Sequence, residues 1–227
     1  MAYAIPAPPT AVIPVLGGAP FPVRRIYCVG RNYAAHAREM GHDPDREEPF
    51  FFMKPTDAIV GNGAEIPYPP MTSDLHHEIE LVVALARGGS DIPVESALDC
   101  VFGYAVGLDM TRRDLQGAAK KLGRPWDFGK GFDNAAPCAA ITPAAKTGHP
   151  GAWAIWLEVN GKLRQKSDLS KLIWNIPETI AYLSRYMTLA PGDIIFSGTP
   201  EGVAAVGRGD RLLGHVDGLE DLEVSYV

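Results

Sequence analysis

The sequence predicts an α+β protein with a β-rich core, and three observations favour this class. Short apolar runs bounded by Gly, Pro, Asn and Asp recur along the chain, as is typical of strands. About four stretches have helical character instead, and no internal repeat or low-complexity block interrupts the pattern. With 227 residues, 46% of them hydrophobic, the chain can bury a sizeable core.

The prolines near the start predict an extended arm over residues 1–23, with one short strand near 11–15. A single catalytic domain is expected over 24–227. The N-terminus lacks the basic flank and unbroken apolar core of a signal peptide, and no apolar run is long enough to span a bilayer. These features predict a cytoplasmic protein without a membrane partner.

Net charge and cysteine content exclude further classes of partner and indicate the redox compartment. The formal net charge is −6 and dense Lys/Arg runs are absent, which argues against nucleic acid and anionic membranes as partners. Cys28, Cys100 and Cys138 lie far apart and fit neither a zinc-ligand spacing nor a disulfide framework. This usage is expected of a reducing compartment.

The individual elements follow from local patterns. A turn at 61–63 predicts a hairpin between its flanking strands, and Asn160-Gly161 predicts a type I′ hairpin. A capping box over 111–114 predicts the start of a helix, and Pro177 suits the first position of another. Strands are expected at 25–29, 50–53, 57–60, 65–66, 77–85, 101–108, 138–141, 154–159, 162–166, 193–196, 211–216 and 222–226. Helices are expected at 33–40, 94–98, 111–121 and 177–186.

The strand at 77–85 carries two carboxylates that the alternation of side chains places on one face. Glu78 and Glu80 are two residues apart, and Asp109 ends the next strongly apolar run. Adjacent carboxylates disfavour each other's ionisation, and a cation between them removes that cost. The alternatives at this point are the solvated face of a half-buried strand and a cation site.

Several other polar residues have both a structural and a functional interpretation. His36 and Glu39 share a face of the short helix at 33–40, either as an exposed pair or as a histidine base with its carboxylate partner. Lys54 follows an aromatic strand, and it either sits at the rim or neutralises an anionic ligand. Lys130, between two glycines, is either a solvated loop cation or a pocket residue that contacts developing negative charge.

Two further segments carry candidate binding groups. Arg113 and Gln116 share one face of the helix that follows Asp109. The loop at 197–202 contains glycines and Thr199 but lacks the Gly-Lys-Ser/Thr ending of a phosphate loop. Its backbone N–H groups and the Thr199 hydroxyl can still hold a carboxylate or carbonyl oxygen.

Taken together, these segments form an ordered series that resembles the fumarylacetoacetate hydrolase superfamily, and within it the short bacterial fumarylpyruvate hydrolases. The series runs from Arg25 almost to the end of the chain. It comprises YCVGRNY at 27–33, His36, Glu39, FMKP at 52–55, HHEIE at 76–80, GLDMTRRDLQ at 107–116, KGFD at 130–133 and GDIIFSGTPEGV at 192–203. The last motif has Ser197 where the family commonly has threonine, and Ser keeps the hydroxyl.

The resemblance implies a mixed β-sandwich roll with a short lid helix, usually assembled as a homodimer. It implies that Mg²⁺ or Mn²⁺, with Ca²⁺ as a possible substitute, is bound by three carboxylates. The roles carry over as follows: Glu78, Glu80 and Asp109 as metal ligands; His36, Glu39 and Lys130 as catalytic residues; Arg113, Gln116, Thr199 and, less directly, Lys54 as substrate-binding residues. Arg31, Arg38 and Lys54 are candidate cations for a distal carboxylate of the substrate.

The activity that the resemblance implies is metal-dependent hydrolysis of a carbon–carbon bond in a β-diketo acid. The expected substrate is fumarylpyruvate, an intermediate of aromatic (gentisate) catabolism, which would yield fumarate and pyruvate. Acylpyruvate hydrolysis, oxaloacetate decarboxylation and hydroxydienedioate isomerisation are alternatives on the same scaffold. A metal-binding homologue without turnover is the alternative of another class, against which the intact set of polar residues argues.

Overall fold

The centre of the molecule is a six-stranded mixed sheet. The computed structural model describes residues 3–34 and 47–227. In spatial order the strands are β12 (Thr142–Pro143), β9 (Val101–Leu108), β8 (Ile79–Leu85), β15 (Asp193–Phe196), β3 (Arg25–Gly30) and β4 (Phe50–Lys54). Only β15 and β3 pair in parallel; the other neighbours are antiparallel. Every residue of β8 is buried, because the sheet is covered on both faces.

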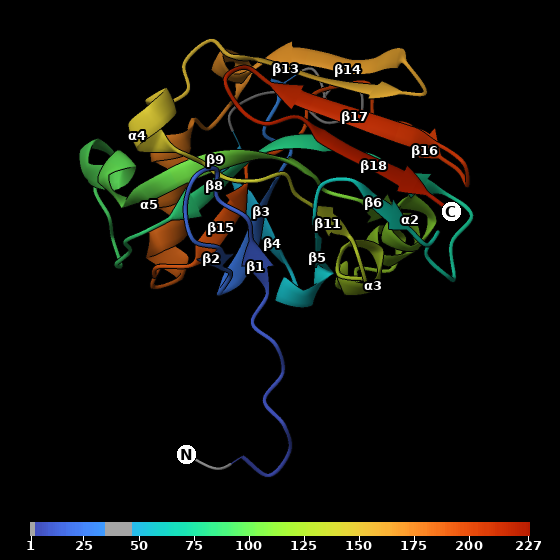
Figure 1. The fold of residues 1–227 in the computed structure, drawn as a ribbon, viewed down its shortest axis with the longest axis horizontal. Helices are drawn as coiled ribbons and strands as arrows, with labels where there is room; N and C mark the ends of the chain where they lie inside the picture. The colour runs from blue at the N-terminus through green and yellow to red at the C-terminus, as the bar shows by residue number, and fades with distance from the viewer. Residues whose placement is uncertain (1–2, 35–46) are drawn as a thin grey trace.

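A second, five-stranded sheet packs over the first (Figure 1). Its order is β14 (Lys162–Asp168), β13 (Ala154–Val159), β17 (Arg211–Val216), β18 (Leu222–Tyr226) and β6 (Ala64–Ile66). Alternate residues of β13, β17 and β18 are buried, so one face is directed toward the core. A Cβ on Gly214 of β17 would lie 2.5 Å from Ile79 Cδ1, which shows how closely the two sheets approach. The predicted β-rich sandwich is therefore confirmed.

Three small sheets and several short helices complete the described part. The small sheets are β1 (Val12–Ile13) with β2 (Phe21–Pro22), β7 (Leu75–His76) between β10 (Thr111–Arg112) and β16 (Ala205–Val206), and β5 (Ile59–Val60) with β11 (Ala136–Pro137). The helices are α2 (Arg113–Lys121), α3 (Asp127–Lys130), α4 (Ala144–Thr147) and α5 (Ile176–Tyr186). Short 3₁₀ helices occupy Thr56–Ala58, Val94–Cys100 and Leu169–Lys171. No described helix is long and apolar enough to cross a membrane.

The N-terminal segment leaves the body and then returns to it. Residues 3–10 are exposed and point away from the domain (Figure 1). Ile13 of β1 is fully buried, and Val15 pairs with Ile141. The hairpin of β1 and β2 packs on the core. The predicted boundary between an N-terminal arm and a catalytic domain at residue 23 stays a prediction.

Two of the predicted turns and caps were wrong. The strands on either side of residues 61–63 do not pair with each other: β5 pairs with β11 and β6 with β18, both in parallel. The predicted capping box at Thr111 does not form either. Asp114 accepts hydrogen bonds from Thr72 and Ser73 instead, so tertiary contacts replace the local cap. A capping box is found at α5, between Asn175 and Glu178.

Two element boundaries also differ from the predictions. Residues 138–141 lie between β11 and β12 in the sequence and form only isolated bridges, Cys138 with Gly107 and Ile141 with Val15. The segment predicted as strand 57–60 begins as a 3₁₀ helix and only its last two residues pair. The predicted lid helix at 33–40 falls mostly outside the described residues.

Candidate active site

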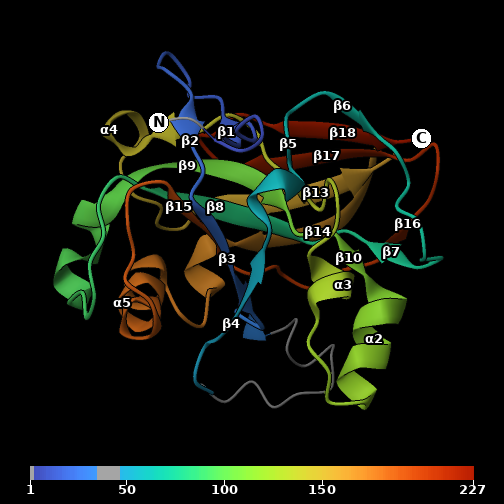
Figure 2. The same cartoon turned by 90° about the horizontal axis from the view of Figure 1, so that it is seen from below.

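Sheet topology brings the candidate site residues to one edge of the central sheet. Because β8 and β9 are antiparallel, the start of β8 adjoins the end of β9, and the Asp109 N–H donates to the Glu78 carbonyl at 2.9 Å. Strand β15 is also antiparallel to β8, so the loop after Phe196 passes the same place. Strand β3 runs parallel to β15, and its end at Gly30 therefore lies on this edge too. Figure 2 shows α2 and α3 beside this end of β3 and β4.

Three carboxylates form a buried cluster here. Glu78, Glu80 and Asp109 each offer an oxygen, and these oxygens lie within 4.8 Å of one another. All three residues are at most 5% exposed. The interpretation of Glu78 and Glu80 as a solvated face is thereby excluded.

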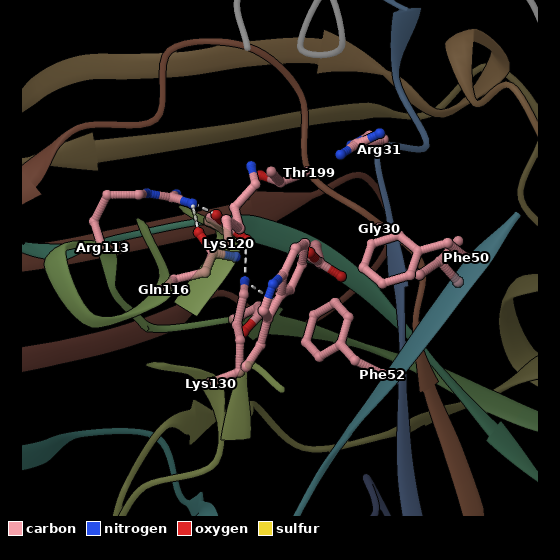
Figure 3. Close-up of a pocket in the computed structure, with 14 residues that line it drawn as sticks. Gly30, Arg31, Phe50, Phe52, Arg113, Gln116, Lys120, Lys130 and Thr199 are labelled. Carbon is pink, nitrogen blue, oxygen red and sulfur yellow. Dashed lines mark hydrogen bonds and ion pairs between the residues drawn. The ribbon is translucent and has the colours of Figure 1, made fainter. Parts of the chain in front are cut away.

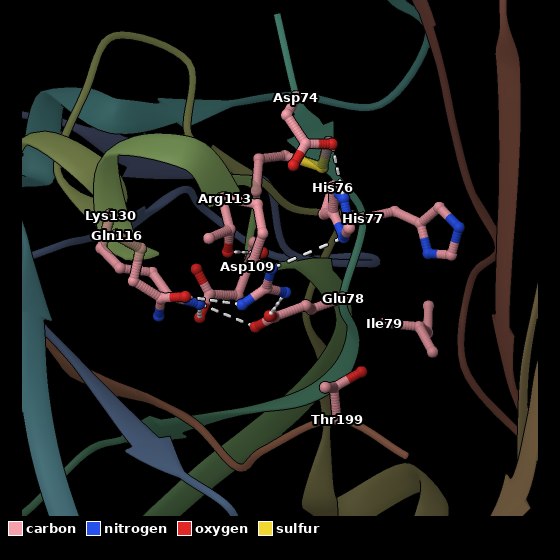
Figure 4. Close-up of polar contacts among 12 residues, drawn as sticks. Asp74, His76, His77, Glu78, Ile79, Asp109, Arg113, Gln116, Lys130 and Thr199 are labelled. Carbon is pink, nitrogen blue, oxygen red and sulfur yellow. Dashed lines mark hydrogen bonds and ion pairs between the residues drawn. The ribbon is translucent and has the colours of Figure 1, made fainter. Parts of the chain in front are cut away.

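Basic side chains surround the carboxylates (Figure 4). Lys130, the last residue of α3, is buried and places its Nζ 2.7 Å from Glu78 Oε2 and 2.6 Å from Asp109 Oδ2. Burial lowers the pKa of Lys130, but Asp109 and Glu78 more than offset this and the net pKa is raised. Arg113 bonds to the other oxygen of Glu78 and to Gln116 Oε1, the latter at 2.7 Å. Lys130 therefore stays protonated and can only donate.

Glu80 differs from its two neighbours because it has no basic partner among the described residues. Its described hydrogen bond comes from the Gly198 N–H at 2.8 Å. Burial, followed by the charges of Asp109 and Glu78, raises the pKa of Glu80 well above its ordinary value. A cation beside this carboxylate would favour its ionised form. An all-oxygen set of this kind fits a hard divalent cation, so the residues present suit the metal that the sequence predicted.

A pocket opens beside the cluster (Figure 3). Its polar wall includes Arg31, Arg113, Gln116 and Thr199, four of the five predicted substrate-binding residues. Glu78, Glu80, Asp109 and Lys130 border it as well. In Figure 3 Arg31 lies across the pocket from Lys130. The structure thus gathers residues from five separate stretches of sequence around one space.

The fifth predicted substrate-binding residue, Lys54, takes a different position. It is buried, with its Nζ 2.7 Å from Asp109 Oδ1, and it donates to the Met110 carbonyl at 3.1 Å. Its ammonium contacts Asp109, and Lys54 is not among the residues that line the pocket. A direct contact between Lys54 and substrate stays a prediction. His36 and Glu39 lie outside the described residues, so their pairing also stays a prediction.

Sequence reasoning missed several residues that line the pocket. Lys120 is four residues beyond Gln116 on α2, so helical spacing placed it on the same face and could have found it. Burial, followed by the charges of Arg31 and Arg113, lowers the pKa of Lys120. Phe50 and Phe52, two residues apart on β4, form an aromatic wall with Trp126, whose ring centroid lies 4.9 Å from that of Phe50. Trp126 carried no sequence signal that pointed to the site.

Comparison with known proteins places these features in a family. The model of the fumarylacetoacetate (FAA) hydrolase C-terminal domain matches residues 25–225. The chain belongs to the fumarylacetoacetate hydrolase family. The predicted resemblance is confirmed, and so is the predicted class of enzyme, a hydrolase that acts on carbon–carbon bonds.

Relatives within the family have more than one activity. A fumarylpyruvate hydrolase from Ralstonia sp is 45% identical over 188 residues, which cover 82% of this chain and 97% of the relative. A mitochondrial oxaloacetate tautomerase from Oryza sativa subsp. japonica is 44% identical over 202 residues, or 88% of this chain and 89% of the relative. The crystal structure of fumarylpyruvate hydrolase from Pseudomonas aeruginosa in complex with Mn²⁺ and pyruvate has a TM-score of 0.97 and 54% identity, and it covers 100% of this chain and 99% of that one. These comparisons establish the family, and the residues that line the pocket determine the substrate.

Proposed function

We propose that this protein hydrolyses fumarylpyruvate to fumarate and pyruvate. The observation that carries the proposal is the composition of one pocket. A buried carboxylate cluster with Lys130 borders it, and Arg31, Lys120 and three aromatic rings also line it. Fumarylpyruvate has a 2-oxo acid at one end, a planar unsaturated chain and a second carboxylate at the other end. Each part has a chemically matching group in this wall.

The cluster of Glu78, Glu80 and Asp109 would hold Mg²⁺ or Mn²⁺, with Ca²⁺ as a substitute. Such an ion supplies electrostatic stabilisation of the negative charge that develops on the 2-oxo acid when the carbon–carbon bond breaks. Related support comes from the Pseudomonas aeruginosa fumarylpyruvate hydrolase, which holds Mn²⁺ together with pyruvate.

The reaction adds the oxygen of water to the carbonyl carbon of the fumaryl group, which becomes the new carboxylate of fumarate. The bond between that carbon and the methylene carbon breaks, and its electron pair leaves on the pyruvate enolate, which then takes a proton. We assign the first proton transfer to His36, oriented by Glu39, as the general base for water. Lys130, whose Nζ lies 2.7 Å from Glu78 Oε2 and 2.6 Å from Asp109 Oδ2, is assigned the role of donor to the developing oxyanion charge.

The distal half of the pocket would fix the other end of the substrate. The Lys120 ammonium lies 5.5 Å from the centroid of the Trp126 ring, beside the aromatic wall. Arg31 is near enough for its charge to lower the pKa of Lys120. A carboxylate between the two cations relieves their mutual repulsion. The rings of Phe50, Phe52 and Trp126 offer flat apolar surface to the unsaturated chain.

Oxaloacetate tautomerisation is the second candidate, favoured by the 44% identity to the rice tautomerase. Oxaloacetate shares the 2-oxo acid end but is shorter than fumarylpyruvate, because its second carboxylate lies three carbons closer to the keto group. It would therefore use the carboxylate cluster without reaching Lys120. The two candidates thus differ in their dependence on a single side chain.

The deciding experiment compares kcat/KM for fumarylpyruvate, acetylpyruvate and oxaloacetate, with pyruvate release measured in the presence and absence of Mg²⁺. Fumarylpyruvate should be preferred, and turnover should require the metal. Higher kcat/KM for oxaloacetate, measured as enol–keto conversion, would make the tautomerase the better assignment. Absence of turnover with all three would leave the non-catalytic alternative.

Two variants test the roles assigned above. Lys120→Met should raise KM for fumarylpyruvate by about 10–100-fold, as expected for loss of a charged hydrogen bond, and leave acetylpyruvate unaffected. Lys121→Met removes the neighbouring exposed lysine, which does not line the pocket, and serves as the matched control. His36→Ala should leave metal binding intact while kcat falls by orders of magnitude. Full turnover by this variant would remove His36 from the mechanism.

We also propose a homodimer in the cytoplasm. Strand β4 is an edge of the central sheet, and Met53 on it is 44% exposed next to the exposed ring of Tyr186. An apolar sheet edge of this kind is suited to an interface. Light scattering during size-exclusion chromatography measures the assembly, and a monomer at micromolar concentration would contradict the proposed homodimer.

The proposed cytoplasmic location is supported by the cysteines. All three are free and buried, which is compatible with a reducing compartment.

A further inference from the structure

Gln165 on β14 connects the pocket residue Thr199 to the start of β8. Its side chain is fully buried. The amide Nε2 donates to Thr199 Oγ1 at 2.9 Å and to the Pro200 carbonyl at 2.8 Å. The amide Oε1 accepts from the Ile79 N–H at 3.1 Å and lies 2.9 Å from His77 Nδ1. Neither the predicted site nor the proposed mechanism uses this residue.

The orientation of this amide is fixed by two backbone groups. The Ile79 N–H can only donate, so the atom facing it must be the oxygen of Gln165. The Pro200 carbonyl can only accept, so the atom facing it must be the nitrogen. A flipped amide would place two donors against each other at Ile79 and two acceptors at Pro200. It follows that Nδ1 of His77 carries the proton of that imidazole and donates it to Gln165.

The same orientation determines what Thr199 can do. A hydroxyl has one proton to donate and accepts through its lone pairs. Gln165 Nε2 occupies an acceptor direction of Thr199 Oγ1, and that bond leaves the hydroxyl proton free for another partner. In the described part of the chain no acceptor takes this proton, and Thr199 borders the pocket beside Glu78 and Glu80. Figure 4 shows Thr199 directly below Glu78.

We propose that Gln165 is a positioning residue, which makes Thr199 a hydrogen-bond donor to an anionic oxygen of the 2-oxo acid ligand. This inference rests on the proposed function for the class of ligand only, not for the identity of the substrate. Without Gln165 Nε2, no described contact fixes the rotation of the Thr199 hydroxyl, so its proton can turn away from the ligand. The hydroxyl then presents a lone pair to the ligand, and two facing acceptors repel.

The test measures the affinity of the Mn²⁺-loaded protein for pyruvate by calorimetry in a double-mutant cycle. Thr199→Val and Gln165→Met should each weaken pyruvate binding by about 10-fold or more, as expected for one hydrogen bond to a charged group. The double variant should bind no more weakly than Thr199→Val alone, since Gln165 acts through the hydroxyl. Thr142→Val, at a buried threonine away from the pocket, is the matched control and should bind pyruvate as the wild type does.

Additional readouts separate positioning from a purely structural role. The affinity for Mn²⁺ should be unchanged in all four variants, and KM should rise without an equal fall in kcat. Gln165→Glu provides a second route if Gln165→Met does not fold. Its carboxylate keeps the bonds from Ile79 and His77, but its second oxygen draws the Thr199 proton away from the ligand. Although it is the conservative replacement in shape, it should weaken pyruvate binding at least as much as Gln165→Met.

Losses that add in the double variant would overturn the inference, because a structural defect does not depend on the hydroxyl at position 199. Wild-type affinity in Thr199→Val, or no pyruvate binding by the wild type, would also overturn it. The substrate assignment fails independently. If fumarylpyruvate is not hydrolysed but the pyruvate cycle is non-additive, the role of Gln165 stands while the proposed substrate does not.

Discussion

The same substitution at two neighbouring glutamates should have opposite effects on the metal-free protein. Glu80 is 2% exposed, has no basic partner among the described residues and faces two other carboxylates. In Glu80→Gln the amide oxygen still accepts from the Gly198 N–H, and the carboxyl whose ionised form is disfavoured here is gone. Glu78, by contrast, is paired with both Lys130 and Arg113. Glu78→Gln leaves these two cations with one carboxylate fewer.

The magnitudes follow from the cost of placing each group in the cluster. Because its pKa is raised, the Glu80 carboxyl takes up a proton when the metal-free chain folds at neutral pH, which costs about 1.4 kcal/mol for each unit by which the pKa is raised. Glutamine has no such cost, so the free energy of unfolding of the metal-free protein should rise by about 2 kcal/mol. At about 2–4 °C per kcal/mol, Tm should rise by roughly 4–8 °C. Breaking the ion pairs of Glu78 should cost about 3 kcal/mol and lower Tm accordingly. Both variants should lose Mn²⁺ affinity by at least about 100-fold, more than outer-shell changes produce.

The assay is thermal unfolding followed by circular dichroism in excess chelator, at one protein concentration so that assembly does not alter Tm. Calorimetric titration with Mn²⁺ gives the metal affinities. A lower Tm for metal-free Glu80→Gln, together with an unchanged Tm for Glu78→Gln, would refute the reasoning. It would show that the Glu80 carboxyl does not destabilise the metal-free protein and that the pairs of Glu78 contribute no stability.

Three further predictions concern a buried histidine, the central lysine and a glycine in the loop. Burial lowers the pKa of His77 to about 4. Between pH 6.5 and 4 the unfolded chain therefore binds more protons than the folded protein, and the free energy of unfolding should fall by roughly 3 kcal/mol as the pH is lowered through this range. Unfolding of His77→Asn from pH 4 to 7 should lack this slope, and a persisting slope would assign it elsewhere. Lys130→Met should destabilise the metal-free protein by about 3–5 kcal/mol, measured by urea unfolding, and Mn²⁺ should restore part of the loss; a neutral effect would contradict the ion pairs seen here. Gly198→Ala should destabilise the protein by about 2 kcal/mol or more in the same assay, because φ at this residue is +98° and the new Cβ would lie 2.6 Å from Asn32 Cβ. Gly61→Ala is the control, since a Cβ at Gly61 would have no atom within 4 Å. Equal effects of the two substitutions would reject the steric argument.

Local patterns were sufficient for most strands, whereas the choice of the three carboxylates as a cluster came from the family resemblance. Alternation over 77–85 placed Glu78 and Glu80 on one face, and the pairing of β8 with β9 then brings Asp109 to them. The hairpin predicted at 61–63 failed because β5 and β6 find partners far along the chain, in β11 and β18. Turn residues show where a chain can reverse, but they do not choose which strand it pairs with.

The sequence by itself determined the fold class, the family resemblance and the three acidic residues of the candidate metal site, because side-chain alternation and motif order are local properties of a chain. Only the tertiary structure decided that Lys54 contacts Asp109, that Lys120 joins the pocket wall and that Gln165 orients Thr199. The contacts of Gln165 join residues as many as 88 positions apart, as in its bond with His77. Their geometry depends on how the two sheets pack, which no pattern within one segment specifies.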